Sequence, residues 1–170
     1  MNKWLTSLVV WFSATAMACG VHQNTGFHLT TEPGSLDVFQ QVIDARSNDQ
    51  FGNLNKPDHF RLFSLKKRLN LPSTHKVDFV IFEAVKGHYS DVVVISSQGE
   101  SGSTKPSVSI SGKQQLPKAD ELMVISEFDV LDALATNVIS WPQAKQQGLV
   151  KINGTAEQVA QLDKWFSQIF

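Results

Sequence analysis

A change in the spacing of hydrophobic residues near Lys76 limits this 170-residue chain to a fold that combines helices with a sheet. Upstream of Lys76, apolar residues recur at three- and four-residue intervals, as they do on one side of an α-helix. Downstream, the spacing becomes two, and β-branched runs such as residues 92–95 appear. The sequence therefore predicts helices first and then a sheet, within the size of one domain.

Five strands are expected in the downstream part of the chain. The first has largely apolar residues on both faces, and Gly87 with its neighbours makes the hairpin to the second. A flexible loop over residues 98–106 separates the second strand from the third, which Gly112 ends. The expected strands cover residues 77–82, 88–96, 107–111, 122–125 and 149–152.

Two helices are expected ahead of the sheet. The first begins at Ser35, and residues 48–57 end it with polar and turn-forming side chains. Residues 60–69 are compatible with a short helix or a strand, and the helix is favoured; Pro72 closes this segment. The first helix is expected to present one apolar stripe, made of Leu36, Phe39, Val42 and Ile43.

The second of these helices carries three consecutive basic residues, Lys66, Lys67 and Arg68. Such a cluster can bind anionic lipid headgroups. A solvated helix end also explains the cluster and is the favoured interpretation.

Capping signals organise the C-terminal part of the chain into three further helices. A Ser or Thr at a helix start accepts a hydrogen bond from the backbone three residues on, where a polar side chain can return it. The pairs with this spacing are Ser126 with Asp129, and Thr155 with Gln158. Ser140 can cap a shorter helix, which begins with Trp141 and ends at Gly148. The final helix is expected to bury Val159, Leu162, Trp165, Phe166 and Ile169.

The segments ELMVISEFDVLDALATN (121–137) and SWPQAKQQGLVKINGTAEQVAQLDKWF (140–166) resemble the sterol carrier protein 2-like superfamily. The similarity is greatest to the version found as the C-terminal domain of alkyl sulfatases. In that family a helix follows the fourth strand, a second helix ends in Gly, and a Lys-Ile-x-Gly strand leads into a terminal amphipathic helix. The residues at the matching positions are Ser126, Leu131, Leu134, Gly148, Lys151, Ile152, Gly154, Leu162 and Phe166.

The resemblance implies an α+β domain over residues 35–170, with a five-stranded mixed sheet, helices on one face and a hydrophobic tunnel between them. Members of the superfamily bind lipids, acyl chains or other apolar molecules. The candidate lining residues are Phe79, Ile81, Met123, Phe128, Leu131, Trp141, Trp165 and Phe166. For each of them alone, a place in a fully packed core is the favoured alternative. The two tryptophans carry more weight, because an indole N–H needs a partner and often lies at a cavity rim.

Residues 1–18 have the pattern of a secretory signal peptide. Lys3 gives a positive start, residues 4–12 are mostly apolar, and residues 13–18 are mostly small. The apolar stretch is too short to span a bilayer as a helix of the mature protein. The polar, turn-rich residues 19–34 that follow predict a tether to the folded domain.

The single cysteine stands directly after this signal. The run Ala16-Met17-Ala18-Cys19-Gly20 resembles a bacterial lipobox, in which the cysteine is lipidated and becomes the new N-terminus. Cleavage after Ala18 without lipidation, which leaves a free thiol on Cys19, is the alternative. Lipidation is favoured because an unpaired thiol is unusual in an oxidising compartment. It implies the periplasm or the outer membrane of a Gram-negative bacterium.

Charge and histidine spacing exclude several classes of function. A formal net charge of −1 leaves no basic excess for a nucleic-acid partner. The sequence has no His-x-His-x-Asp-His cluster like that of the alkyl sulfatase zinc domain, and His22 and His28 have no third ligand nearby. A Gly-x-Ser-x-Gly nucleophile motif is also missing. The sequence therefore predicts a protein that is not an enzyme and needs no cofactor.

Two functions remain. In the first, an exported, membrane-tethered module carries or sequesters a hydrophobic small molecule, such as a lipid or a surfactant, in its tunnel. In the second, the cavity is filled, and the module binds a protein partner of the cell envelope through its sheet edge or its loops. A homodimer, formed by pairing an exposed strand edge such as residues 107–111 with that of a second copy, is a further alternative.

Overall fold

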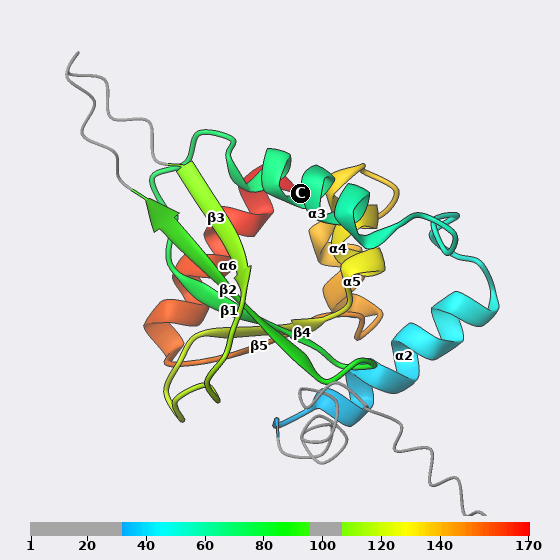
Figure 1. Cartoon of the computed structure of the whole chain (residues 1–170), viewed down its shortest axis with the longest axis horizontal. Coiled ribbons are helices and arrows are strands. Elements are labelled where there is room, and N and C mark those ends of the chain that lie inside the picture. Colours follow the sequence, from blue (N-terminus) through cyan, green and yellow to red (C-terminus); the bar gives the residue numbers. More distant parts are fainter. Residues whose placement is uncertain (1–31, 96–106) are drawn as a thin grey trace, which may run out of the picture.

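A five-stranded sheet and five helices make up the part of the chain that the computed structural model describes, residues 32–95 and 107–170 (Figure 1). The strands are β1 (Phe79–Glu83), β2 (His88–Ile95), β3 (Ser107–Gly112), β4 (Met123–Ser126) and β5 (Lys151–Asn153). The helices are α2 (Ser35–Ser47), α3 (Asp58–Leu69), α4 (Phe128–Ala135), α5 (Trp141–Gln146) and α6 (Ala156–Ile169). The predicted signal peptide, Cys19, the tether up to residue 31 and the loop over residues 98–106 lie outside the described residues.

The sheet is mixed, with the strand order β3-β2-β1-β4-β5. β1 runs parallel to β4 and antiparallel to β2, while the edge strands β3 and β5 are each antiparallel to their neighbour. Gly87 allows the tight turn from β1 to β2, because its φ of 67° is one that L side chains rarely adopt. The predicted five-stranded mixed sheet of an α+β fold is confirmed.

β1 lies at the centre of the sheet and is buried on both faces, as its apolar pattern predicts. The ring of Phe79 contacts the rings of Trp165 and Phe166, so this side chain faces α6. Because side chains alternate along a strand, Ile81 shares the face of Phe79, whereas the alternate residues such as Phe82 face the other way. The core therefore extends to both sides of β1.

The segment that leads into α2 crosses the face of the sheet opposite to α6. Tyr89 is paired with Phe82 on that face, and its hydroxyl donates a hydrogen bond to Glu32 Oε1 at 2.9 Å. Gly34 follows with a φ of 84°, and a Cβ at this position would lie 2.3 Å from Lys151 Nζ of β5. The positive φ favours glycine at the start of α2, whereas the flexible end of the Lys151 side chain can shift to make room for a Cβ.

The apolar stripe predicted for α2 is wrong in part. Leu36 and Ile43 are 56% and 37% exposed. The buried face of the helix is made instead of Ser35, Val38, Val42 and Ala45. Arg46 lies next to that face, and its guanidinium pairs with two buried carboxylates. This pairing fixes the rotation of the helix, and it turns part of the predicted stripe toward solvent.

The helix favoured for residues 60–69 is confirmed as α3, which begins directly after Pro57. Two of the predicted caps are confirmed as well. Thr155 Oγ1 accepts a hydrogen bond from the backbone of Gln158, and Ser140 does the same with Gln143. Within α6, the fully buried members of the predicted stripe are Leu162, Trp165, Phe166 and Ile169, while Val159 is half-buried.

The capping box predicted from Ser126 and Asp129 is wrong. Ser126 is the last residue of β4, and its hydroxyl donates to the carbonyl of Leu149 at 3.0 Å. The helix α4 begins two residues later, after Glu127, which makes no side-chain cap. Asp129 pairs with Arg46 instead of returning a bond to the strand. A half-buried arginine from a distant segment therefore binds the side chain that the local pattern assigns to a cap.

Candidate functional site

Five aromatic side chains pack against one another between the sheet and the two C-terminal helices. They are Phe79 from β1, Trp141 from α5, Trp165 and Phe166 from α6, and the terminal Phe170; we call them the aromatic cluster. Phe166 is its centre, with ring centroids 5.0 Å from Trp141, 5.5 Å from Phe79 and 5.6 Å from Trp165. The rings meet edge to face, the arrangement that aromatic pairs prefer in protein cores. The sequence prediction had named four of these five residues.

The two indoles of the cluster differ in their hydrogen bonding. Trp141 Nε1 donates to Asp163 Oδ1 at 2.7 Å, and Lys145 Nζ pairs with the same oxygen at 2.5 Å. Trp165 Nε1 is buried and has no hydrogen-bond acceptor among the described residues. An unsatisfied buried donor costs about 1–3 kcal/mol, so few are retained without a reason. Trp165 is the one residue of the cluster with an unused polar group.

The other predicted lining residues do not all join the cluster. Ile81 and Leu131 are fully buried in the same hydrophobic core. Phe128 is also buried, but it lies beneath Lys86, whose Nζ is 5.8 Å from the ring centroid. Met123 pairs with Val80 and therefore lies on the sheet face opposite to Phe79. The structure thus separates Met123 from the cluster by the sheet itself.

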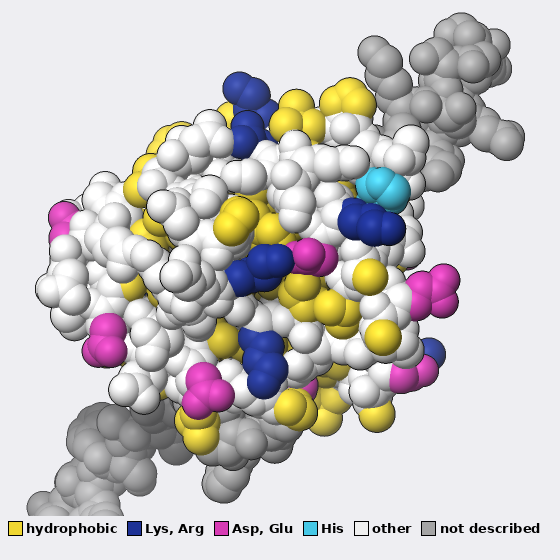
Figure 2. All heavy atoms as spheres, turned by 180° about the vertical axis from the view of Figure 1, so that it is seen from behind, with side chains coloured by type: hydrophobic (Ala, Val, Ile, Leu, Met, Phe, Trp, Pro, Cys, Tyr) yellow, Lys and Arg dark blue, Asp and Glu magenta, His cyan; other side chains and the backbone are white. Residues whose placement is uncertain are grey.

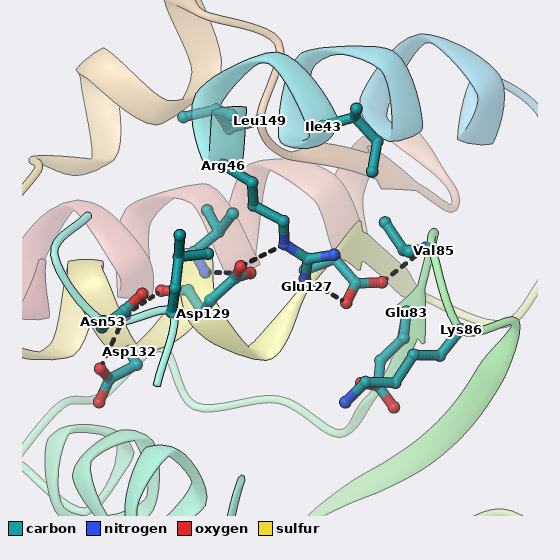
Figure 3. A network of polar contacts seen from close by, with 12 residues as sticks. Ile43, Arg46, Asn53, Glu83, Val85, Lys86, Glu127, Asp129, Asp132 and Leu149 are labelled. Atoms are coloured by element: carbon teal, nitrogen blue, oxygen red, sulfur yellow. Dashed lines mark hydrogen bonds and ion pairs between the residues drawn. The ribbon is translucent and has the colours of Figure 1, made fainter. Parts of the chain in front are cut away.

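A second group of contacts, absent from the sequence prediction, is a buried ionic network at the end of β4 (Figure 3). Arg46 of α2 lies between two acidic side chains, with Nε 2.5 Å from Asp129 Oδ2 and Nη2 3.0 Å from Glu127 Oε2. The side chains of Glu127 and Asp129 are 0% and 1% exposed, whereas that of Arg46 keeps 22% of its surface in contact with solvent. The backbone N–H of Val85 donates to the second oxygen of Glu127 at 2.6 Å.

The same network continues on either side of Arg46. Lys56 and Asn53, in the loop between α2 and α3, hold the buried carboxylate of Asp132 at 2.5 Å and 3.0 Å. On the other side, Lys86 Nζ lies 3.0 Å from Glu83 Oε1 at the end of β1. The carboxyl ends of the parallel strands β1 and β4 therefore both lead into buried acids with basic partners.

Burial changes the acidity of two of these groups. Burial raises the pKa of Glu127 above its usual value, and the nearby carboxylate of Glu83 adds to the rise, while the Val85 N–H and Arg46 oppose it. Burial likewise raises the pKa of Glu83, against the effect of Lys86. A raised pKa in the folded state means that the contribution of the group to the free energy of unfolding falls as the pH rises through that pKa.

Around Arg46 and Lys56, the ionic network forms a structural tie between elements of the fold. Both oxygens of Glu127 and both oxygens of Asp129 already accept hydrogen bonds from the protein. Both oxygens of Asp132 are bound in the same way. A carboxylate that acts on a substrate needs a free position for it. What the network does is join α2, the loop that follows it and the first turn of α4.

Sequence reasoning missed this network because it assigned Asp129 to a helix cap and did not consider the other acids. One signal was available: Glu83 ends an otherwise apolar strand, and Glu127, Asp129 and Asp132 interrupt an otherwise apolar run. Acidic residues are rarely buried unless they are paired. Their partners, Arg46, Lys56 and Lys86, are far from them in sequence or give no pattern of their own, so the pairing itself could not be foreseen.

Within residues 32–95 and 107–170, no three His, Cys, Asp or Glu side chains are arranged to hold a metal ion. In the same two stretches, no helix is both long and apolar enough to cross a membrane. Comparison of the chain with protein-family models, curated proteins and solved structures found no match.

We expect Arg46→Met to lower the free energy of unfolding by about 3 kcal/mol, because it leaves Glu127 and Asp129 buried without their cation. Chemical denaturation followed by circular dichroism measures the change. Lys145→Met is the matched control, since it removes a cation from an exposed pair with Asp163 and is expected to cost less than about 1 kcal/mol. Equal losses in the two variants would contradict the role given to Arg46.

Proposed function

We propose that this domain binds a hydrophobic ligand, such as a lipid, an acyl chain or a surfactant, at the aromatic cluster, without a covalent step. The observation that carries the proposal is the buried N–H of Trp165, which has no acceptor among the described residues. An indole nitrogen can only donate. The group that completes it is an oxygen acceptor, which a carboxylate, an ester or a hydroxyl headgroup supplies.

The surroundings of this N–H suit the rest of such a ligand. Phe79 and Phe166 flank Trp165, and Ile81 lies on the same face of the sheet as Phe79. Apolar contact contributes about 25 cal/mol for each Å² removed from water and has no directional requirement. One polar anchor in an apolar site therefore fixes the headgroup, while the chain of the ligand gains affinity from buried area.

A second candidate function is that of an interaction module with a filled core, which binds an envelope protein or a second copy of the chain. Two observations favour it. The rings of the aromatic cluster fill space against one another edge to face. In addition, β3 is an edge strand of the described sheet, with β2 as its neighbour, and such edges can pair with another strand.

We further propose that the chain is exported to the periplasm or the outer membrane of a Gram-negative bacterium, where a lipid on Cys19 tethers it to a membrane. Support comes from the apolar run of residues 4–12 and the small residues before the cysteine. A tether places a lipid-binding domain close to a source of its ligand.

The ligand-binding proposal is tested by titrating the chain, labelled with ¹⁵N-tryptophan, with sodium laurate. Each indole N–H gives its own cross-peak in a ¹H–¹⁵N spectrum, and Trp165→Phe and Trp141→Phe identify the two that matter. We expect the Trp165 peak to move more than the Trp141 peak, because the Trp141 N–H already donates to Asp163.

The same two variants also test the role of the N–H in affinity. We expect Trp165→Phe, which keeps an aromatic ring but removes the donor, to weaken laurate binding about tenfold. Trp141→Phe is the matched control, because it removes an N–H of the same cluster that Asp163 already accepts, and it is expected to lower laurate affinity less than Trp165→Phe does. A Trp165 peak that does not move at saturating laurate would contradict the proposal and favour the filled-core alternative.

The tether is tested by growing cells that express the full chain with radiolabelled palmitate. We expect the wild-type protein to take up the label and to sediment with membranes, and we expect Cys19→Ser to abolish labelling. A wild-type protein that takes up no label would contradict the lipid tether.

A further inference from the structure

Helix α3 exposes two phenylalanine rings on the side that faces away from the core. Phe60 is 54% exposed and Phe63 is 69% exposed, whereas Leu65 and Leu69 on the opposite side are almost completely buried. At 3.6 residues per turn, Phe60, Phe63 and Lys67 lie along one side of the helix. We call this side, together with Lys66, the α3 outer face.

The charge on the α3 outer face is positive. Lys66 and Lys67 are both exposed, and neither forms an ion pair with a described residue. The acid nearest in sequence, Asp58, is already paired with Lys86 at 2.8 Å and with Arg61 at 2.9 Å. Two aromatic rings beside two free ammonium groups therefore face solvent together.

Other exposed apolar side chains of the described residues belong to other elements and loops, among them Leu36, Leu54, Leu116 and Val138. On the face seen from behind, Lys, Arg, Asp and Glu side chains are interspersed with scattered hydrophobic ones (Figure 2). Single exposed apolar residues of that kind are ordinary and need no partner. Two rings on adjacent turns of one helix, with bases of one sign beside them, are the pattern of a helix that lies in a membrane interface.

We propose that the α3 outer face docks on an anionic lipid bilayer. Phe60 and Phe63 enter the boundary between headgroups and acyl chains, and Lys66 and Lys67 contact the headgroup phosphates. The complementary charge selects a lipid surface, because phosphates at that surface attract lysines, whereas the rings need only an apolar layer beneath them. The favoured sequence interpretation of the basic cluster, a solvated helix end, did not take account of the exposed rings.

This docking surface is independent of the ligand proposed for the aromatic cluster. The α3 outer face points to solvent, whereas Trp165 is fully buried in the core on α6. The inner side of α3 packs against α4, so loss of the exposed rings leaves the core contacts in place. A failure of either proposal therefore leaves the other standing.

Vesicle co-sedimentation tests the proposal, with the full chain carrying Cys19→Ser in every sample so that no acyl anchor contributes. One set of vesicles is made of phosphatidylcholine alone. The other is a mixture of phosphatidylcholine with about a quarter of the anionic lipid phosphatidylglycerol. We expect tighter binding to the mixture, and weaker binding when salt is raised. Phe60→Ser with Phe63→Ser is expected to lower the partition coefficient on the mixture about tenfold or more.

The charge contribution is tested separately, with the rings left intact. Lys66→Gln with Lys67→Gln is expected to lower binding to the anionic mixture about tenfold and to leave binding to phosphatidylcholine unchanged. Leu116→Ser with Lys118→Gln is the matched control, because both residues are exposed outside α3, and it is expected to bind as the parent does. All replaced side chains are exposed, and a circular dichroism spectrum like that of the parent checks the fold of each variant.

Phe63→Trp supplies a direct measure of depth. Brominated lipids quench tryptophan fluorescence on contact, so they are expected to quench the variant more than the parent, which has the same Trp4, Trp11, Trp141 and Trp165 but no indole at position 63. Equal binding of the parent to both vesicle types, or equal binding of the phenylalanine variant and the parent to the mixture, would overturn the proposal. Capture of a protein partner that depends on Phe60 and Phe63, without vesicle binding, would also overturn it.

Discussion

The arrangement of α2 and of the loop that follows it depends on the ion pairs of Arg46. Its guanidinium joins α2 to Glu127 and Asp129, two acids that are buried at the point where β4 becomes α4. Without that cation the fold would hold two charged groups in a low-dielectric interior, which is far more costly than an exposed pair. The same contact fixes which side of α2 is buried, and it replaces the cap that the local pattern predicts for α4. One buried ionic network therefore decides both the rotation of one helix and the start of another.

The two ends of the interior are chemically different. At the carboxyl ends of β1 and β4, each buried acid has a basic partner, and the carboxylate oxygens of Glu127, Asp129 and Asp132 are all bound. Beside α5 and α6, the interior is aromatic, and one N–H, that of Trp165, has no acceptor in the described part of the chain. The other buried side-chain atoms without a hydrogen bond belong to Asn53, Arg61, Arg68 and Glu83, which all make other polar contacts, whereas the indole of Trp165 has only this one polar group. We therefore place the proposed ligand at the aromatic end. The exposed rings of α3 concern a different surface and a different partner.

Much of the fold could be predicted because its signals are local. The period-two pattern gave the five strands, and the caps at Ser140 and Thr155 depend only on residues three apart. The errors came where a distant side chain changes the local choice. Leu36 and Ile43 are exposed because the ion pairs of Arg46 set the rotation of α2. Asp129 pairs with the same arginine and does not form the expected cap. For the candidate site, hydrophobicity identified four members of the aromatic cluster. Hydrophobicity could not show that Met123 lies on the opposite face of the sheet, because the register of the strands decides which face a residue takes. Nor could it show which of the two indoles lacks a hydrogen-bond acceptor.

Native mass spectrometry shows directly whether the interior holds an apolar ligand. The protein is purified without denaturant from its own host. We expect the folded chain to retain the mass of one apolar molecule. A denaturing spectrum of the same sample should lose that mass, while a covalent lipid on Cys19 would remain. A folded chain that carries no added mass, and that instead travels with one stoichiometric protein partner, would contradict the account and leave the domain as an interaction module with a filled core.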